Sequence, residues 1–214
     1  MYYIDLQANF ERANFTIFID TLCRCILYGS NIILALSLNF IARGMTKTLT
    51  REIDLVSGII TKEVYRVGRK RHRDPLEGPA VIERCRATGT ITFEEYRVNG
   101  RLHREGGPAS ISRWSTGAVT FEEYRLKGRQ HRDPADGAAF IDRDGNTGVV
   151  VQEHYIWNGK LHRDPNDGPA VIYRDWKTGI TWNREYWLHG QQIAAPRRRV
   201  DAPRRVVRGN RPSP

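Results

Sequence analysis

Four His-Arg pairs recur along the chain, and their side chains are the ones best suited to chemistry. The pairs are His72-Arg73, His103-Arg104, His131-Arg132 and His162-Arg163. An Asp follows three of them directly, at Asp74, Asp133 and Asp164. An imidazole near a carboxylate can work as a general base, and several imidazoles together can bind zinc. The guanidinium groups could also bind anions along one edge of the molecule.

The spacing of these pairs argues against a shared ion or a catalytic pocket. Equivalent residues of neighbouring repeats are expected to lie two or three strands apart, roughly 9–15 Å. Zinc requires ligand nitrogens at about 2.0–2.1 Å from one ion. Each Asp precedes a Pro, a position where the carboxylate usually caps its own backbone. We therefore predict no enzyme, no catalytic residue, no cofactor and no metal; a pocket built from repeat His and carboxylates is the alternative.

The His-Arg pairs belong to an internal repeat. Five Tyr residues, from Tyr65 to Tyr186, recur with spacings of 31, 28, 31 and 31 residues. His follows the first four of these five by seven residues, and Gly precedes each of the five by seven. The repeat-defining structural residues are Tyr65, Tyr96, Tyr124, Tyr155, Tyr186, His72, His103, His131, His162, Arg73, Arg104, Arg132 and Arg163. Such self-similarity is the signature of a repeat architecture.

Each repeat is predicted to form short strands. The stretch 89–100, GTITFEEYRVNG, is rich in β-branched and aromatic residues and has no helical period. Asn99-Gly100 and Asn158-Gly159 favour two-residue hairpin turns, and Lys127-Gly128 and His189-Gly190 occupy matching positions. In the first repeat Gly68 comes one position early, so the sequence does not predict the turn type of that hairpin. A third strand is expected at 81–84, closed by Thr88-Gly89.

The expected turn sets a register for the hairpin. Tyr96 should face His103, and Glu95 should face Arg104, with Glu123 opposite Arg132 in the next repeat. Because side chains alternate along a strand, Tyr and His would share one face of the sheet and Glu and Arg the other. Cross-strand pairs of this kind contribute roughly 0.2–1 kcal/mol each.

The strings VNGRLHREGGPASI and WNGKLHRDPNDGPAVIY resemble the NGKLHREDGPA-type β-hairpin repeat of bacterial, phage and giant-virus proteins, which is similar to the MORN-repeat variant group. The likeness covers about residues 55–193. It implies an interaction scaffold and an all-β fold. Together with the spacing, it predicts an elongated antiparallel meander of about four to five tandem 28–31-residue repeats (MORN-like), with an N-terminal helix as one option and a disordered C-terminal tail.

Charge divides the chain of 214 residues into three parts. The net charge of +10 includes +6 from the last part, which has seven Arg and one Asp. We predict an N-terminal extension at 1–50, a repeat domain at 51–195 and a disordered tail at 196–214. The anion-binding candidates of the tail are Arg197, Arg198, Arg199, Arg204, Arg205, Arg208 and Arg211. A solvated tail without a partner is the alternative.

Residues 26–42 form an uncharged stretch at the lower limit of a membrane span. Three interpretations are open: upstream sequence wrongly included in the reading frame, a membrane anchor, or an amphipathic helix that caps the sheet. We predict a cytoplasmic location, with membrane anchoring through 26–42 as the alternative. Three Cys, at 23, 25 and 85, are too few for a disulfide framework.

The function that these features favour is a non-enzymatic scaffold that binds a protein partner along a sheet face. Aromatic side chains often anchor such interfaces, although they could equally pack within the sheet. The candidates are Trp114, Trp157, Trp176, Trp182 and Trp187. Binding of nucleic acid or an anionic membrane through the Arg tail is the second hypothesis. No small-molecule substrate is inferred.

Overall fold

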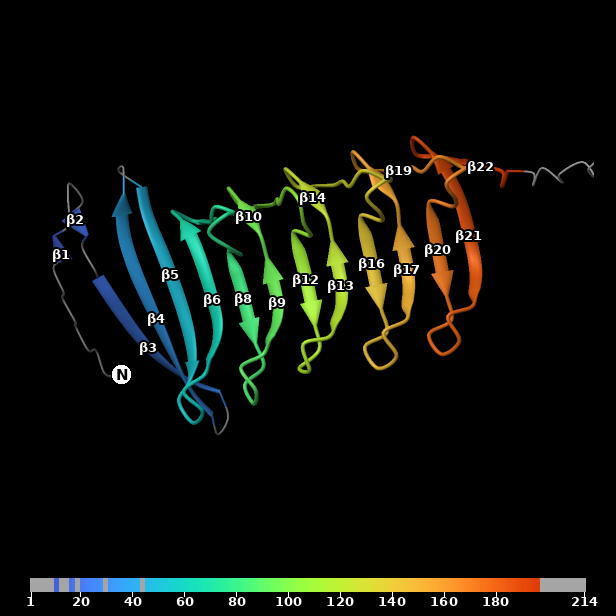
Figure 1. Ribbon diagram of the computed structural model, residues 1–214. Coiled ribbons are helices and arrows are strands. Elements are labelled where there is room, and N and C mark those ends of the chain that lie inside the picture. The colour runs from blue at the N-terminus through green and yellow to red at the C-terminus, as the bar shows by residue number, and fades with distance from the viewer. Residues whose placement is uncertain (1–9, 12–15, 18–19, 29–30, 43–44, 197–214) are drawn as a thin grey trace, which may run out of the picture.

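The computed structural model describes residues 10–11, 16–17, 20–28, 31–42 and 45–196, and side chains from residue 46 onward. These residues form strands and turns, with no helix among them. Most strands join one 14-stranded antiparallel sheet that runs in chain order, as Figure 1 shows. The predicted all-β antiparallel meander is therefore confirmed. Many of its strands are short, because turns that contain Gly interrupt the sequence at close intervals.

The sheet begins with long strands and continues with short ones. The long strands are β3 (Asp20–Tyr28), β4 (Asn31–Ala42), β5 (Met45–Asp54) and β6 (Ile60–Val67). The strands of four residues are β8 (Val81–Arg84), β12 (Ser110–Arg113), β16 (Phe140–Arg143) and β20 (Val171–Arg174). Their partners are β9 (Ile91–Glu95), β13 (Val119–Glu123), β17 (Val150–His154) and β21 (Thr181–Leu188).

Small hairpins project along one side of the sheet, which we call the hairpin side (Figure 1). They are β10 (Arg97–Val98) with β11 (Arg101–Leu102), β14 (Arg125–Leu126) with β15 (Arg129–Gln130), and β18 (Ile156–Trp157) with β19 (Lys160–Leu161). β7 (Lys70–Arg71) pairs with β6, and β22 (Gln191–Ile193) pairs with β21. A separate two-stranded sheet consists of β1 (Phe10–Glu11) and β2 (Thr16–Ile17).

The hairpin turns have the predicted geometry. Asn99, Lys127, Asn158 and His189 all have φ of 51°, and the Gly that follows each has φ between 78° and 86°. Positive φ at both central residues defines the type I′ turn. The first hairpin closes differently: Val67 pairs with Lys70, and only Gly68 of the two turn residues has positive φ, at 57°. This pattern is that of a type II′ turn, so the early Gly68 changes the turn type and keeps the two-residue length.

Bulges and capped turns shape the opposite ends of the strands. A register shift follows Glu83 in the β8–β9 pair, and Thr92 at this point donates a hydrogen bond from its hydroxyl to the carbonyl of Glu83 at 3.3 Å. The turn after β20 is closed by Asp175, whose carboxylate accepts bonds from the backbone N–H groups of Lys177 and Thr178. These bonds, led by that of Thr178, hold the pKa of Asp175 below its ordinary value.

The N-terminal helix expected as one option is wrong: within 26–42, residues 26–28 end β3 and Asn31–Ala42 form β4. The sequence of β4 alternates Leu34, Leu36, Leu38 and Phe40 with smaller or polar residues, which is the period of a strand. Among the described residues, the structure has no apolar helix of the length needed to cross a membrane. β5 spans position 50 and pairs with both β4 and β6, while the domain boundaries at 50 and 195 stay predictions.

The described core lies between the sheet and the loops that follow the hairpins. Ala80, Ala109, Ala139 and Ala170, one from each loop, are 0% exposed. In the C-terminal half, Ile141, Ile172 and Tyr155 pack with Ala138 and Ala170. The core is therefore thin, and its contacts are repeated from one loop to the next.

Candidate functional site

The repeated Arg and Tyr residues stack on one another. The guanidinium carbon of Arg73 lies 4.0 Å from the ring centroid of Tyr65. The distances for Arg104 on Tyr96, Arg132 on Tyr124 and Arg163 on Tyr155 are 3.8, 4.0 and 3.9 Å. Such cation–π contacts contribute about 0.5–2 kcal/mol. The recurring Arg thus stabilises the ring of its own repeat.

Each of these Arg side chains also holds the loop that covers it. Arg163 donates from Nη1 to the carbonyl of Pro169 at 3.2 Å, and the guanidinium groups of Arg73, Arg104 and Arg132 donate to the equivalent carbonyls. Gly168 has φ of 127°, and a Cβ there would lie 3.2 Å from Nη1 of Arg163. The Gly of this loop is therefore required both by its backbone conformation and by the Arg that packs against it.

The expected pairing of Glu95 with Arg104, and of Glu123 with Arg132, is wrong. The β10–β11 hairpin has only two residue pairs, Arg97–Leu102 and Val98–Arg101. The ladder ends with one more hydrogen bond, from the His103 N–H to the Tyr96 carbonyl. The Arg104 N–H instead donates to the carbonyl of Arg125 in the next repeat at 3.1 Å. Because the chain crosses to the neighbouring repeat here, Arg lies on the Tyr ring and not opposite Glu.

The carboxylates in question bind other guanidinium groups. Arg97 donates to both oxygens of Glu95 at 2.6 and 2.8 Å, and Arg71 donates to it at 3.2 Å. Burial raises the pKa of Glu95, but the hydrogen bond and charge of Arg97, together with Arg71, outweigh it and leave the pKa below its ordinary value. Arg125 binds Glu123 in the same way, at 2.7 Å. The Glu residues next to Tyr are thus paired within the sheet.

The repeat histidines connect adjacent hairpins. Nδ1 of His72 accepts a hydrogen bond from the backbone N–H of Asn99 at 3.0 Å. His103, His131 and His162 accept equivalent bonds from Lys127, Asn158 and His189 at 3.2, 3.1 and 3.3 Å. An accepting Nδ1 carries no proton, so the neutral ring is protonated at Nε2. These four side chains act as structural links between repeats.

One aromatic cluster on the hairpin side was not predicted. The rings of His162 and His189 stack with centroids 4.2 Å apart, and Trp157 stacks on His162 at 5.2 Å. Burial, followed by the charge of His189, lowers the pKa of His162. The sequence predicted His189 only as a turn residue, because it stands outside the column of repeat histidines. No group of three His, Cys, Asp or Glu side chains among the described residues could hold a metal ion.

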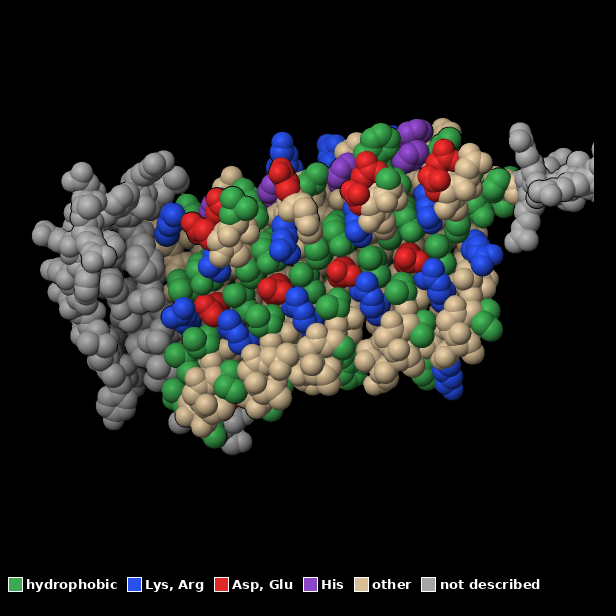
Figure 2. Space-filling view, in the orientation of Figure 1, with side chains coloured by type: hydrophobic (Ala, Val, Ile, Leu, Met, Phe, Trp, Pro, Cys, Tyr) green, Lys and Arg blue, Asp and Glu red, His purple; other side chains and the backbone are tan. Residues whose placement is uncertain are grey.

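A second regular feature crosses one face of the sheet, which we call the ladder face. Ladder pairing places Glu63, Ile82, Glu94, Ile111, Glu122, Ile141, Glu153, Ile172 and Arg184 side by side on successive strands. Figure 2 shows a row of acidic side chains on this molecule with basic ones directly beside it. Each Glu of the row receives an Arg from the next strand, in the pairs Glu63–Arg84, Glu94–Arg113, Glu122–Arg143 and Glu153–Arg174, at 2.5–2.9 Å.

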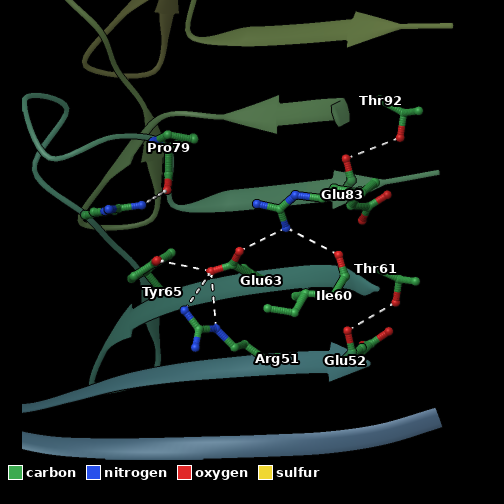
Figure 3. A network of polar contacts seen from close by, with 11 residues as sticks. Arg51, Glu52, Ile60, Thr61, Glu63, Tyr65, Pro79, Glu83 and Thr92 are labelled. Carbon is green, nitrogen blue, oxygen red and sulfur yellow. Dashed lines mark hydrogen bonds and ion pairs between the residues drawn. The ribbon is translucent and has the colours of Figure 1, made fainter. Parts of the chain in front are cut away.

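The first Glu of the ladder illustrates how these carboxylates are satisfied (Figure 3). Glu63 is 6% exposed; besides Arg84 it binds Arg51 at 3.4 Å and accepts the hydroxyl of Tyr65 at 3.3 Å. Burial, followed by the negative charge of Glu63, raises the pKa of Tyr65. The phenol therefore stays protonated and donates a hydrogen bond to the carboxylate of Glu63. A buried charge needs such partners, because an unpaired one costs several kcal/mol.

The opposite face carries a row of rings that we call the aromatic strip: Phe121, Phe140, His154, Tyr173 and Trp182. Neighbouring centroids are 5.2, 5.1, 6.0 and 5.2 Å apart along the row. Strand alternation places it opposite the ladder, since Phe121 and Phe140 adjoin Glu122 and Ile141 in sequence. Trp182 is 68% exposed, and burial lowers the pKa of His154 within the strip.

One groove on the hairpin side, of about 490 Å³, lies between two repeats. Its lining includes Arg104, Tyr124, His131, Arg132 and Asp133. Two of these, Arg132 and Tyr124, form one of the stacks, and Nδ1 of His131 is occupied by the N–H of Asn158. The groove thus brings together groups that already bind one another.

The predicted Trp anchors divide between exposed and engaged positions. Trp114, Trp157, Trp176 and Trp182 are 48, 40, 47 and 68% exposed. Trp187 is partly buried and donates from its indole nitrogen to Glu185 at 2.9 Å. The Arg residues of the tail, 197–214, lie outside the described residues, as does the predicted disorder there.

Comparison with known proteins adds no relative: no family model matches the chain, and no curated protein or solved structure matches it significantly.

Proposed function

We propose that the protein is a non-enzymatic repeat scaffold that binds a protein partner. The observation that carries this proposal is the aromatic strip, five rings in contact across neighbouring strands of a sheet face. Rings of this kind are enriched in the centres of protein interfaces, where a few of them supply most of the binding energy. The resemblance of the repeat to NGKLHREDGPA-type arrays supports the same role. A cytoplasmic location remains a prediction.

The contacts of the repeat residues support a scaffold over an enzyme. An enzyme needs a nucleophile or a base that is free to meet a substrate. Here the repeat Arg side chains stack on Tyr and bind loop carbonyls, and Nδ1 of each repeat His accepts a backbone N–H. The guanidinium groups and the Nδ1 atoms of the repeat residues thus bind other groups of the protein itself.

Affinity capture with a matched control tests the scaffold proposal. We would compare the full chain, a Tyr173→Ser/Trp182→Ser variant of the strip, and a Leu76→Ser control, because Leu76 is 97% exposed in a loop away from the strip. A partner identified by mass spectrometry should bind the wild type and the control alike and lose at least about tenfold in affinity for the strip variant. Equal binding to all three proteins would contradict a role for the strip.

Anion binding through the tail is the second candidate, because seven Arg and one Asp concentrate a charge of +6 in residues 197–214. An oligonucleotide and a phosphatidylserine vesicle are suitable probes. Affinity should fall steeply between about 50 and 200 mM salt and disappear when residues 197–214 are removed. Undiminished binding by the truncated chain would rule out this function for the tail.

A further inference from the structure

The last strand of the array has an open side. β21 pairs with β20 along Val171–Arg174, and on its other side β22 pairs only with Tyr186, Trp187 and Leu188. The stretch Thr181–Glu185 therefore has a single partner strand among the described residues. An uncovered strand of this kind presents backbone N–H and C=O groups that can pair with another chain.

Elsewhere in the sheet the residues that correspond to Asn183–Glu185, such as Gln152–His154 of β17, are paired on both sides, and the covering strands are alike. β6, β9, β13 and β17 are followed by β8, β12, β16 and β20. Each of these four strands is preceded by a completely buried Ala, carries an Ile at 7–8% exposure, and has an Arg two residues after that Ile. The covering strand in this fold thus has the pattern Ala-x-Ile-x-Arg.

The charge of the edge differs from that of the inner strands. On β17, Glu153 pairs in the ladder with Ile172 and forms an ion pair with Arg174 two residues further along. On β21 the same ladder position is occupied by Arg184, which faces Ile172 as Glu153 faces Ile141. Arg184 is exposed and makes no ion pair with any described residue. An incoming strand with Arg two residues after its Ile would place two guanidinium groups together.

We propose that the β21 edge, Thr181–Glu185, binds an extended strand of a partner protein with the pattern Ala-x-Ile-x-Glu, whose carboxylate pairs with Arg184. Backbone ladder bonds supply affinity in this mode, and the side chains at alternate positions supply specificity. The exposed side chains of Ile180 (67%), next to the edge, and Trp182 (68%), within it, offer apolar contact. The proposal deepens the scaffold function, which it presupposes, by naming the partner's chemistry.

The same charge disfavours the two occupants that the chain itself could supply. A second copy cannot supply its four-residue strands, because they are already paired on both sides, and its own β21 edge carries Arg184 again. The tail 197–214 carries seven Arg and one Asp. Like charges placed close together discourage a wrong pairing as effectively as opposite charges promote the right one. The edge is thus selective for an acidic strand from another protein.

Peptide binding to the full chain tests this proposal. The probes are two labelled peptides, one with the sequence of residues 168–175, GPAVIYRD, and one with Glu in place of its Arg. We expect the Glu peptide to bind about tenfold more tightly than the Arg peptide, and Arg184→Glu to reverse the preference. A third peptide, the Glu peptide N-methylated at its central amides, should not bind, because it cannot form the ladder.

Several results would overturn the proposal. They are equal affinity for the Glu and Arg peptides, no reversal by Arg184→Glu in a chain whose circular dichroism is unchanged, and binding of the methylated peptide. Tighter peptide binding after removal of 197–214, or concentration-dependent association of the wild type that Arg184→Glu changes, would assign the edge to the tail or to a second copy. A strip variant that leaves β21 unchanged, Phe140→Ser/Tyr173→Ser, separates the two hypotheses. Lost partner capture with an unselective edge leaves the scaffold standing without this site.

Discussion

The inner strands and the last strand of the sheet carry different residues, with different contacts, at corresponding positions. On β17, Glu153 binds Arg174, and the Tyr155 that follows lies under Arg163. On β21, Arg184 replaces the Glu, and Ile193 pairs with Tyr186 where the other repeats have His. The inner positions are closed by contacts from the next repeat, while the last strand has no such cover among the described residues. The repeat residues therefore hold the array together, whereas the proposed binding edge lies where the repeat pattern is broken.

The largest expected difference between the two regions concerns the repeat Tyr. Tyr155→Ala removes a ring that is 9% exposed and stacked with Arg163, so unfolding free energy should fall by about 3–5 kcal/mol. Tyr186→Ala, at the partly buried last position, should cost only about 1–2 kcal/mol. Guanidinium titration followed by circular dichroism measures both. Equal losses would show that the last strand is packed like the inner ones.

A charge reversal on the ladder should have the next largest effect. Glu122→Arg places a second guanidinium against Arg143, at a side chain that is 20% exposed, and should cost about 2–3 kcal/mol. Arg184→Glu, the opposite reversal on β21, should change stability by no more than about 0.5 kcal/mol, since Arg184 is exposed. Thermal melts of both variants test this contrast, and a large loss for Arg184→Glu would contradict the open edge.

Loss of a stacked Arg should be smaller again. Arg163→Met removes the contact with Tyr155 and the bond to the Pro169 carbonyl, for a loss of about 1–2 kcal/mol. The matched control is Lys177→Met, since the ammonium of Lys177 lies over Trp176 at 4.8 Å on an exposed turn. That change should cost less than about 0.5 kcal/mol. If denaturation curves show the same shift for both, the stack has no structural role beyond that of a surface contact.

Acidification should produce the smallest change, and its direction follows from two histidines. Burial lowers the pKa of both His154 and His162 in the folded protein. The unfolded chain therefore binds more protons below about pH 6.5, so stability should decrease as pH falls from 7.5 through that value. His154→Phe should reduce the slope of melting temperature against pH. A stability that rises on acidification over this range would contradict the lowered pKa values of His154 and His162.

Much of the local structure followed from turn chemistry and strand periodicity. The strand at 81–84 and the Asn-Gly turns form as expected, since positive φ at Asn99 and Gly100 is what that pair of residues favours. The interpretation of 26–42 as a helix rested on its lack of charge and overlooked its alternation. The Glu95–Arg104 pair failed because a ladder of two residue pairs ends before reaching it.

Contacts between repeats were beyond the reach of local patterns. The bond from the Asn99 N–H to His72 and the packing of Trp114 against Gly145 join residues about one repeat apart, and their geometry depends on the lateral spacing of the repeats. The difference between the last strand and the inner strands, by contrast, was visible in the sequence. Arg184 stands two residues before Tyr186, where Glu precedes each of the other four Tyr, and the aligned repeats show that substitution directly.

Hydrogen exchange of the full chain tests the contrast between closed and open strands most directly. Amides of Gln152–His154 on β17 have partner strands on both sides, whereas Thr181–Glu185 on β21 has one. Exchange measured residue by residue should show slow exchange throughout the β17 segment and fast exchange at the outward-facing amides of the β21 segment. Equal protection of the two segments would contradict an open C-terminal edge.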